Sequence, residues 1–295
     1  PDGAGGGGGW RSVLVAATVV TRRLVGVMCA ATVVAALMAA PTPASGDSAA
    51  VPSSAASSTS AWRPDVAAAK RYARQRPGRV GFVLRDGDGH VVASLRPHRT
   101  VYSASIIKSI FVTAFVNRRS VRDRPLRRRE RQLLRPMIVR SDDGAATTVR
   151  DLLGTRRVLA LARRAGMTDF RYNPYRWGLS RISPADMSRY FLRLPGLLTP
   201  RHRDWVMRLF HDITPRQRWG VPPATPTGWR WYLKGGWIDG IVNQVALLES
   251  GRTRLSLAVL IVGTPGSEER VQHHPGRAPG THTITGVTRR LLAGL

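Results

Sequence analysis

A serine and a lysine stand three residues apart in the stretch "YSASIIKS" (102–109), as Ser105 and Lys108. Residues at this spacing lie on one face of a helix, and a helix is predicted to begin near Ser105. A serine hydroxyl becomes a nucleophile only beside a base, and a buried lysine can lose its proton whereas arginine cannot. Lysine is also rare, because among 46 basic residues the only lysines are Lys70, Lys108 and Lys234. The stretch therefore indicates an activated serine at position 105.

Two later stretches extend this pattern. Ser141-Asp142-Asp143 lies in "RSDDGAAT", and Lys234-Gly235-Gly236 lies in "YLKGGW". The motifs Ser-x-x-Lys, Ser-Asp-Asn and Lys-Thr-Gly, in this order, mark the penicillin-interacting serine hydrolases. This chain has SIIK, SDD and KGG in the same order. It therefore resembles the class A β-lactamase family over most of residues 62–295, including "ISPADMSRYFLRL".

The resemblance implies a role for each matching residue. Ser105 would be acylated, with Lys108 as a general base or proton relay. Ser141 would pass a proton toward the leaving nitrogen, and Lys234 would set the local potential and help to hold a substrate carboxylate. The backbone N–H groups of Ser105 and Trp237 would form the oxyanion hole. The residues implied in substrate binding are Asp143, Gly235, Gly236 and Trp237.

The chain departs from the family pattern at three places. Asp143 stands where the family has Asn, and a carboxylate beside Lys108 would raise the lysine pKa. Gly235 replaces Thr and removes a hydroxyl. The family's deacylating Glu lies between the second and third motifs, and none of the four Glu of this chain lies between Asp143 and Lys234. Asp169 is the acid nearest the corresponding stretch and the candidate deacylation acid or base. Without such a base, water attack on the acyl-enzyme is expected to be slow.

Two function classes follow from these residues. The first is a secreted serine hydrolase acylated at Ser105 that acts on β-lactams or related amides and esters. The alternative is a non-hydrolytic module of the same fold that binds penicillin or a cell-wall peptide, as a sensor. The expected partner in either case is a small-molecule or peptide substrate, such as a β-lactam or a cell-wall stem peptide, and the protein is expected to be a monomer.

A third class, a polyanion binder, rests on the net charge of +28 alone. Arginine is spread along the whole chain and no nucleic-acid motif accompanies it, so no specific nucleic acid is expected. Weak contact with anionic cell-wall polymers remains an expectation. We expect no cofactor and no metal, because "GDG" (87–89) lacks the Glu of a calcium loop and His273-His274 has no further ligand at a suitable spacing.

The N-terminal part has the features of an export signal. Arg22-Arg23 precede an apolar run over 24–40, and small residues such as Ala44 follow. We therefore predict a signal peptide region over 1–44, a disordered Ser/Ala/Pro linker over 45–61, and secretion or a cell-envelope location. Retention of 24–40 as a membrane anchor is the alternative. The single cysteine, Cys29, excludes an intramolecular disulfide.

One domain, 62–295, must position these residues. Hydrophobic periodicity and turn residues predict helices and strands in the order helix, two strands, a block of helices, three strands, helix. The predicted helices are 65–75, 105–117, 125–139, 155–165, 184–193, 201–211 and 281–295, and the predicted strands are 79–86, 90–95, 229–237, 241–250 and 254–263. Together with the resemblance, this order predicts an α+β fold with three α/β/α layers. A five-stranded antiparallel sheet is flanked by helices and joined to an all-helical lobe.

Overall fold

The computed structural model describes residues 62–295. The predicted signal peptide and linker lie outside the described residues. No helix within 62–295 combines the length and the apolar character that crossing a membrane would need.

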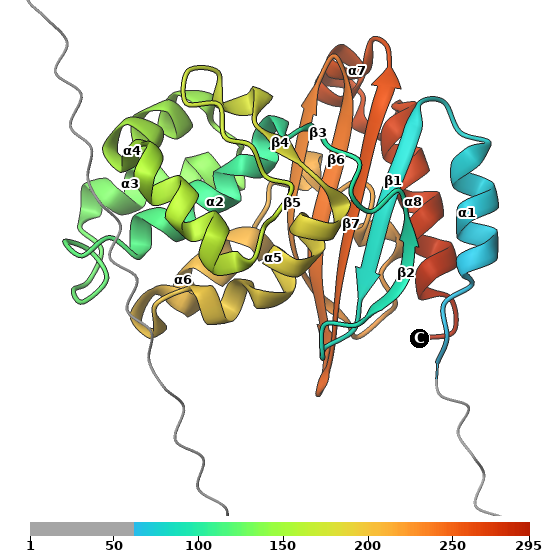
Figure 1. Cartoon of the computed structure of the whole chain (residues 1–295), viewed down its shortest axis with the longest axis horizontal. Helices are drawn as coiled ribbons and strands as arrows, with labels where there is room; N and C mark the ends of the chain where they lie inside the picture. The colour runs from blue at the N-terminus through green and yellow to red at the C-terminus, as the bar shows by residue number, and fades with distance from the viewer. Residues whose placement is uncertain (1–61) are drawn as a thin grey trace, which may run out of the picture. The chain divides into compact units, whose positions relative to one another are not determined.

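The centre of the fold is a five-stranded antiparallel sheet in the order β2-β1-β7-β6-β5 (Figure 1). The strands are β1 (Arg79–Arg85), β2 (Val91–Leu95), β5 (Arg230–Ile238), β6 (Gly240–Ser250) and β7 (Thr253–Thr264). β6 and β7 are apolar at nearly consecutive positions and are buried over most of their length. Such a strand requires cover on both faces of the sheet.

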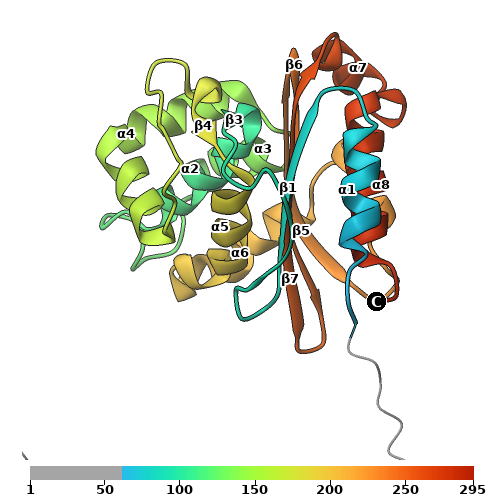
Figure 2. The same ribbon diagram turned by 45° about the vertical axis from the view of Figure 1, so that its right-hand side comes forward.

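Helices supply that cover (Figure 2). α1 (Val66–Arg74) and α8 (Pro279–Leu292) pack against each other on one face, with α7 (Ser267–His273) above them. The other face carries α5 (Pro184–Leu197), which contacts β1, β6 and β7, and the helical lobe beyond it. That lobe contains α2 (Ile107–Val116), α3 (Arg128–Val139), α4 (Asp143–Ala165) and α6 (Pro200–His211).

α2 is the central helix of the lobe. Its sequence, IKSIFVTAFV, has almost no polar face, and all ten of its residues are buried. A helix that is apolar all round is stable only when other elements surround it. Lys108 is therefore carried into the interior by the helix on which it lies.

The predicted fold class is confirmed, and most predicted elements are present within a few residues. α4 begins twelve residues before the predicted 155–165 helix. It starts directly after the N-cap Asp142 and continues through a kink at Gly154, whose φ is 67°. α7 and the two-residue strands β3 (Val101–Tyr102) and β4 (Arg181–Ile182) were not predicted. Such short elements carry little periodicity of their own. The structure also contains short 3-10 turns: η1 (Ala104–Ile106), η2 (Trp177–Leu179), η3 (Pro215–Gln217), η4 (Pro222–Ala224) and η5 (Pro275–Arg277).

Candidate active site

Ser105 lies in η1, at the junction between the sheet and α2. β3 leads into η1 and is held on two sides. The Asn243 side chain donates to the Tyr102 carbonyl at 2.9 Å, and the Ser103 N–H donates to the Ser180 carbonyl at 2.7 Å. Ala104 has φ 45°, a left-handed conformation that costs a non-glycine residue about 1 kcal/mol or more and is common at functional sites.

Lys108 lies directly beside this serine. Its Nζ is 2.9 Å from Ser105 Oγ and 3.2 Å from Ser141 Oγ, and it also donates to the Ser141 carbonyl and the Asp143 carboxylate. The Lys108 side chain is fully buried, and its Nζ lies 5.1 Å from the centre of a Trp177 ring. A neutral amine in this place has two N–H groups for Ser141 and Asp143 and one lone pair for the Ser105 hydroxyl proton.

The pKa of Lys108 lies below the ordinary value for lysine. Burial lowers it, and the charge and hydrogen bond of Asp143 act in the opposite direction without cancelling the effect. The sequence predicted that the Asp143 carboxylate raises the pKa of Lys108, and this direction is correct. Because Asp143 is 75 % exposed at its side chain, water screens its charge and weakens its hold on the lysine.

Ser141 connects this lysine to the second one. Lys234 Nζ donates to Ser141 Oγ at 2.9 Å and to the Gly235 carbonyl at 2.9 Å. Burial lowers the pKa of Lys234 well below its ordinary value, and the nearby charge of Lys108 lowers it further. Ser141 itself has φ 61°, another left-handed non-glycine residue at the site. The serine hydroxyl is thus positioned to carry a proton between two amines.

The two glycines after Lys234 are explained by close contacts. A Cβ at Gly236 would lie 2.9 Å from the backbone nitrogen of Ser105, so β5 can approach η1 only if residue 236 has no side chain. A Cβ at Gly235 would lie 2.9 Å from the Trp219 ring. The indole therefore fills the space into which a threonine side chain would project. Trp219 in turn makes an edge contact with Trp237, at 6.0 Å between ring centres.

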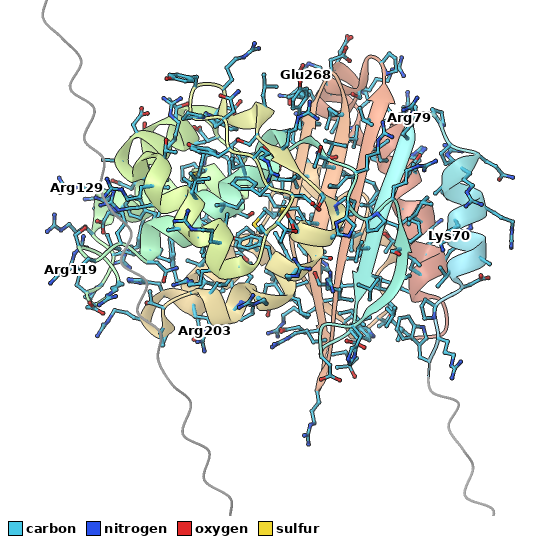
Figure 3. The ribbon with its side chains drawn as sticks, viewed as in Figure 1. Lys70, Arg79, Arg119, Arg129, Arg203 and Glu268 are labelled. Atoms are coloured by element: carbon cyan, nitrogen blue, oxygen red, sulfur yellow. The ribbon has the colours of Figure 1, made fainter. Side chains whose placement is uncertain are left out.

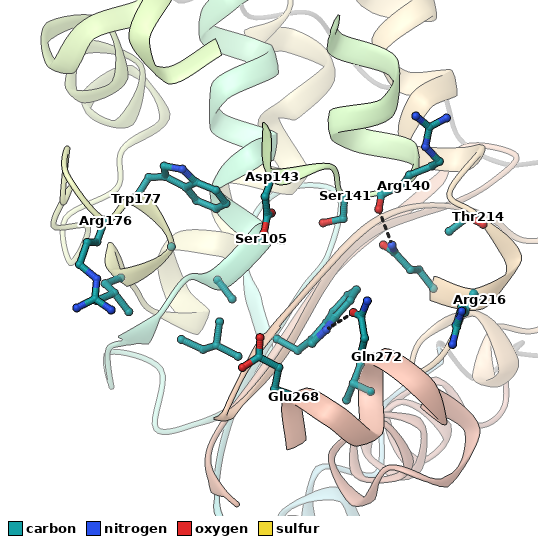
Figure 4. A pocket seen from close by; sticks show the side chains of 17 residues that line it. Ser105, Arg140, Ser141, Asp143, Arg176, Trp177, Thr214, Arg216, Glu268 and Gln272 are labelled. Atoms are coloured by element: carbon teal, nitrogen blue, oxygen red, sulfur yellow. Dashed lines mark hydrogen bonds between the residues drawn. The ribbon is translucent and has the colours of Figure 1, made fainter. Parts of the chain in front are cut away.

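Ser105 opens into a cavity of about 660 Å³, which reaches between the helical lobe and α7 (Figure 4). Ser141, Asp143 and Trp237 also line it. The cationic lining residues are Arg140, Arg176 and Arg216, and the carboxylates are Asp143 and Glu268. Figure 4 shows the Arg140 guanidinium pointing away from Ser105, so the lining charges facing the cavity are mixed in sign. The volume is within the range of small-molecule sites.

The structure brings together all the predicted site residues except Asp169. Asp169 does not line the cavity; its carboxylate accepts hydrogen bonds from Ser183 at 2.7 Å and from His98 at 2.9 Å. Burial raises the pKa of Asp169, but these hydrogen bonds outweigh it, so the net pKa is lowered. Glu268 points into the cavity from α7, on the side opposite Asp143 (Figure 4).

Several residues of the site were missed by the sequence prediction. Trp177, Arg140 and Arg216 line the cavity, and Asn243 anchors the strand before Ser105. Arg140 precedes the SDD motif directly, and this adjacency was a usable signal. Asn243 interrupts an apolar strand, and a polar residue at a buried position indicates a specific partner. Nothing local distinguishes Arg216 from the other arginines.

One cluster of metal-ligating groups lies elsewhere in residues 62–295. Ligand atoms of Asp86, Asp88 and His90 lie within 4.8 Å of one another on the turn between β1 and β2. The Asp86 carboxylate accepts the backbone N–H groups of Asp88 and His90, as in an ordinary polar turn. None of these three residues lines the cavity at Ser105.

Several solved structures of other proteins share this fold. Two similar solved structures are a β-lactamase from Sphaerobacter thermophilus (20 % identity, TM-score 0.63, covering 77 % of this chain and 95 % of that one) and a class A β-lactamase from Mycobacterium abscessus (20 %, 0.64, 77 % and 98 %). A third is the protein PBP-A, at 17 % identity and TM-score 0.61, covering 77 % and 93 %. These likenesses show a shared fold.

No curated protein matches the chain. A family model described as "Beta-lactamase enzyme family" matches residues 121–294, which is more than half of the sequence. That stretch includes two of the three motif segments that meet at the site, SDD and KGG. The chain therefore belongs to the beta-lactamase enzyme family.

Proposed function

We propose that this protein is a secreted serine hydrolase that is acylated at Ser105 by β-lactams or related amides and esters. The observation that carries the proposal is the contact of 2.9 Å between Ser105 Oγ and the Nζ of Lys108, a buried lysine whose pKa is lowered. A lowered pKa makes the uncharged form of the amine more accessible, and the uncharged amine can take the serine proton.

The proposed reaction uses the four motif side chains in sequence. Lys108 Nζ accepts the hydroxyl proton while Ser105 Oγ bonds to the substrate carbonyl carbon. The N–H groups of Ser105 and Trp237 would stabilise the negative oxygen. The C–N bond then breaks as Ser141 donates its hydroxyl proton to the leaving nitrogen. Ser141 recovers a proton from the ammonium of Lys108 or Lys234, both within hydrogen-bond distance.

A second candidate, a non-hydrolytic module that binds penicillin or a cell-wall peptide, is favoured by one observation. Among residues 62–295, Asp143 and Glu268 are the only carboxylates that line the cavity. Asp143 is held by Lys108, and Glu268 lies on the opposite wall. An acyl-enzyme without a base beside it hydrolyses slowly. A single-residue mutant of PBP-A was itself solved as an acyl-enzyme complex with penicillin G.

Intact mass spectrometry after incubation with benzylpenicillin tests acylation. We expect an adduct with the mass of the whole antibiotic on the wild type and none on Ser105→Ala. An equal adduct on both proteins, or none on either with benzylpenicillin and nitrocefin, refutes acylation at Ser105. Nitrocefin then separates the two candidates. Continuous turnover identifies a hydrolase, and a single stoichiometric burst identifies the binding module.

We also propose export through residues 1–44 and a monomeric mature protein. The support is the basic and apolar order of the N-terminal sequence and its Ser/Ala/Pro continuation. N-terminal sequencing of the protein recovered from culture medium is expected to begin near residue 45. Recovery only in the membrane fraction, with 24–40 intact, identifies the anchored alternative. Light scattering of the mature protein tests the monomer.

A further inference from the structure

A second groove opens beside the catalytic cavity. It has a volume of about 410 Å³ and is lined by Arg128, Arg131, Gln132, Arg135, Pro136 and Arg140. We call it the α3 groove, because most of these residues belong to α3. Arg140 lines both the α3 groove and the cavity that contains Ser105. The groove and the catalytic cavity therefore meet at Arg140.

The arginines of the groove follow the helical repeat. Arg128, Arg131 and Arg135 lie at i, i+3 and i+7, so they share one exposed face of α3 over about 10 Å of helix axis. The buried residues Leu134, Met137 and Ile138 lie on the neighbouring side of the helix, with Ile138 three residues after Arg135. The arginines thus border the side by which α3 packs into the lobe.

None of these arginines has a carboxylate partner within residues 62–295, and no carboxylate lines the groove. The contrast with Arg124 is direct, because Arg124 forms a two-pronged ion pair with Glu130 at 2.6 and 2.8 Å. Like charges at i,i+3 and i,i+4 destabilise a helix by about 0.2–0.5 kcal/mol per pair. Arg131 forms such a pair with each of its two neighbours on this face. Nothing in the described chain offsets that repulsion, and an anionic ligand would.

The surroundings of the groove narrow the class of ligand. Figure 3 shows the labelled Arg119 and Arg129 projecting from the same end of the helical lobe, which adds two cations near α3. None of the large exposed apolar side chains lies on α3; they are Val91, Tyr102, Leu152 and Tyr175. Insertion into a lipid bilayer needs such side chains next to the basic ones. The site that the groove meets is built for acyl transfer, so its ligand carries an amide or ester.

We propose that the α3 groove binds an acidic peptide segment whose amide-bearing end enters the cavity at Ser105. The inference rests on the proposed function, because it assigns a substrate class to the same site. The arginines would bind successive carboxylates through charge-assisted hydrogen bonds. The peptide would then pass Arg140, where the groove and the cavity meet, toward Ser141 and Ser105. The substrate is then a peptide with several carboxylates on one side of its reactive carbonyl.

The first experiment measures binding without acylation. Fluorescein-labelled hexaglutamate is titrated into the full chain carrying Ser105→Ala, and fluorescence anisotropy is recorded at about 50 mM and about 300 mM NaCl. In this background we compare Arg131→Gln/Arg135→Gln with the matched control Arg71→Gln/Arg74→Gln. The control removes two exposed arginines from α1, which lies across the sheet from the helical lobe (Figure 2). Both double variants lower the net charge by the same amount.

We expect the Arg131/Arg135 variant to weaken hexaglutamate binding about tenfold, as two exposed ion pairs of about 0.7 kcal/mol each would. The control variant is expected to stay within twofold of its parent. Equal losses in both variants would show that net charge alone attracts the peptide, and would overturn the proposal. Absence of measurable binding at the lower salt would also overturn it. So would a short DNA duplex that binds more tightly than hexaglutamate through the same two arginines.

The second experiment links the groove to the cavity. Unlabelled hexaglutamate is added to the protein with Ser105 intact, and the rate of acylation by benzylpenicillin is followed by intact mass. We expect inhibition that disappears in the Arg131/Arg135 variant, with each rate expressed relative to the same protein's rate without peptide. Unaltered inhibition in that variant contradicts the proposal. If Ser105 is never acylated but the first experiment succeeds, the proposed function fails while the peptide-binding groove is retained.

Discussion

The ion pair between Lys108 and Asp143 makes one substitution especially informative. Asp143→Asn keeps the size of the side chain and an oxygen that accepts from Lys108, and removes the negative charge. Because that charge holds the pKa of Lys108 up, its removal lowers the lysine pKa further. At a fixed pH below that pKa, a larger share of Lys108 is then uncharged and able to accept the proton of Ser105.

The magnitude follows from the geometry. An opposite charge in direct contact shifts a pKa by about 1–3 units. The Asp143 side chain is 75 % exposed, so water screens its charge and its effect on the pKa of Lys108 lies toward the low end of that range. At a pH below the lysine pKa, even the low end of the range raises the uncharged fraction of Lys108 about tenfold. We therefore expect acylation near pH 6 to become about tenfold faster in Asp143→Asn.

The assay is the second-order acylation rate constant with nitrocefin, measured by stopped flow from about pH 5 to about pH 9. The matched control is Asp142→Asn, which removes a neighbouring charge that affects Lys108 less. Asn also replaces Asp well as the N-cap of α4. The rising limb of the profile should move to lower pH in Asp143→Asn and much less in the control. An unmoved limb, or one displaced equally by Asp142→Asn, refutes the reasoning. If the plateau of the pH–rate profile rises and its rising limb does not move, the gain in acylation rate comes from the new amide donor.

Three further predictions concern the structural support of the site. Gly236→Ala places a Cβ 2.9 Å from the backbone nitrogen of Ser105. We expect the unfolding free energy, measured by urea denaturation, to fall by about 1–3 kcal/mol. We also expect most of the acylation, measured by intact mass, to be lost. Asn243→Leu removes the side-chain donor of the Tyr102 carbonyl and the side-chain acceptor of the Ile261 N–H. It should lower the unfolding free energy by about 2–4 kcal/mol, and an unchanged urea midpoint contradicts this role. For Glu130, the hydrogen bond from Arg124 lowers the pKa in the folded state from its usual 4.5 to about 2. Its stabilisation is present above pH 4.5 and is lost as pH falls toward 2. Between pH 4.5 and pH 2, the unfolding free energy of the wild type should therefore fall by about 1 kcal/mol more than that of Glu130→Gln. This figure allows for the partial exposure of the ion pair.

Much of the site was predictable because its signals are local or ordered along the chain. Ser105 and Lys108 are three residues apart, so a single helical turn brings them together whatever the rest of the fold does. The order of SIIK, SDD and KGG identified the fold through resemblance. Apolar segments bounded by turn residues located the five strands, because a strand buried on both faces needs a continuous apolar run.

The remaining features depend on contacts between residues far apart in sequence. The direction of the Asp143 effect on Lys108 was predicted, but its size depends on the depth of burial, which only packing around α2 sets. Asp169 was the nearest acid by position, and the fold instead pairs it with His98 and Ser183.

The same holds for the shape and charge of the cavity. Trp219, from the loop before β5, occupies the space that a threonine side chain at position 235 would need. No spacing rule in the sequence connects Trp219 with Gly235. Arg140 could be read beside the SDD motif, but its place between the cavity and the α3 groove could not. A local sequence determines which side chains one turn or one strand presents together. Only the closed chain decides which distant charges share a cavity, because their distances are set by packing.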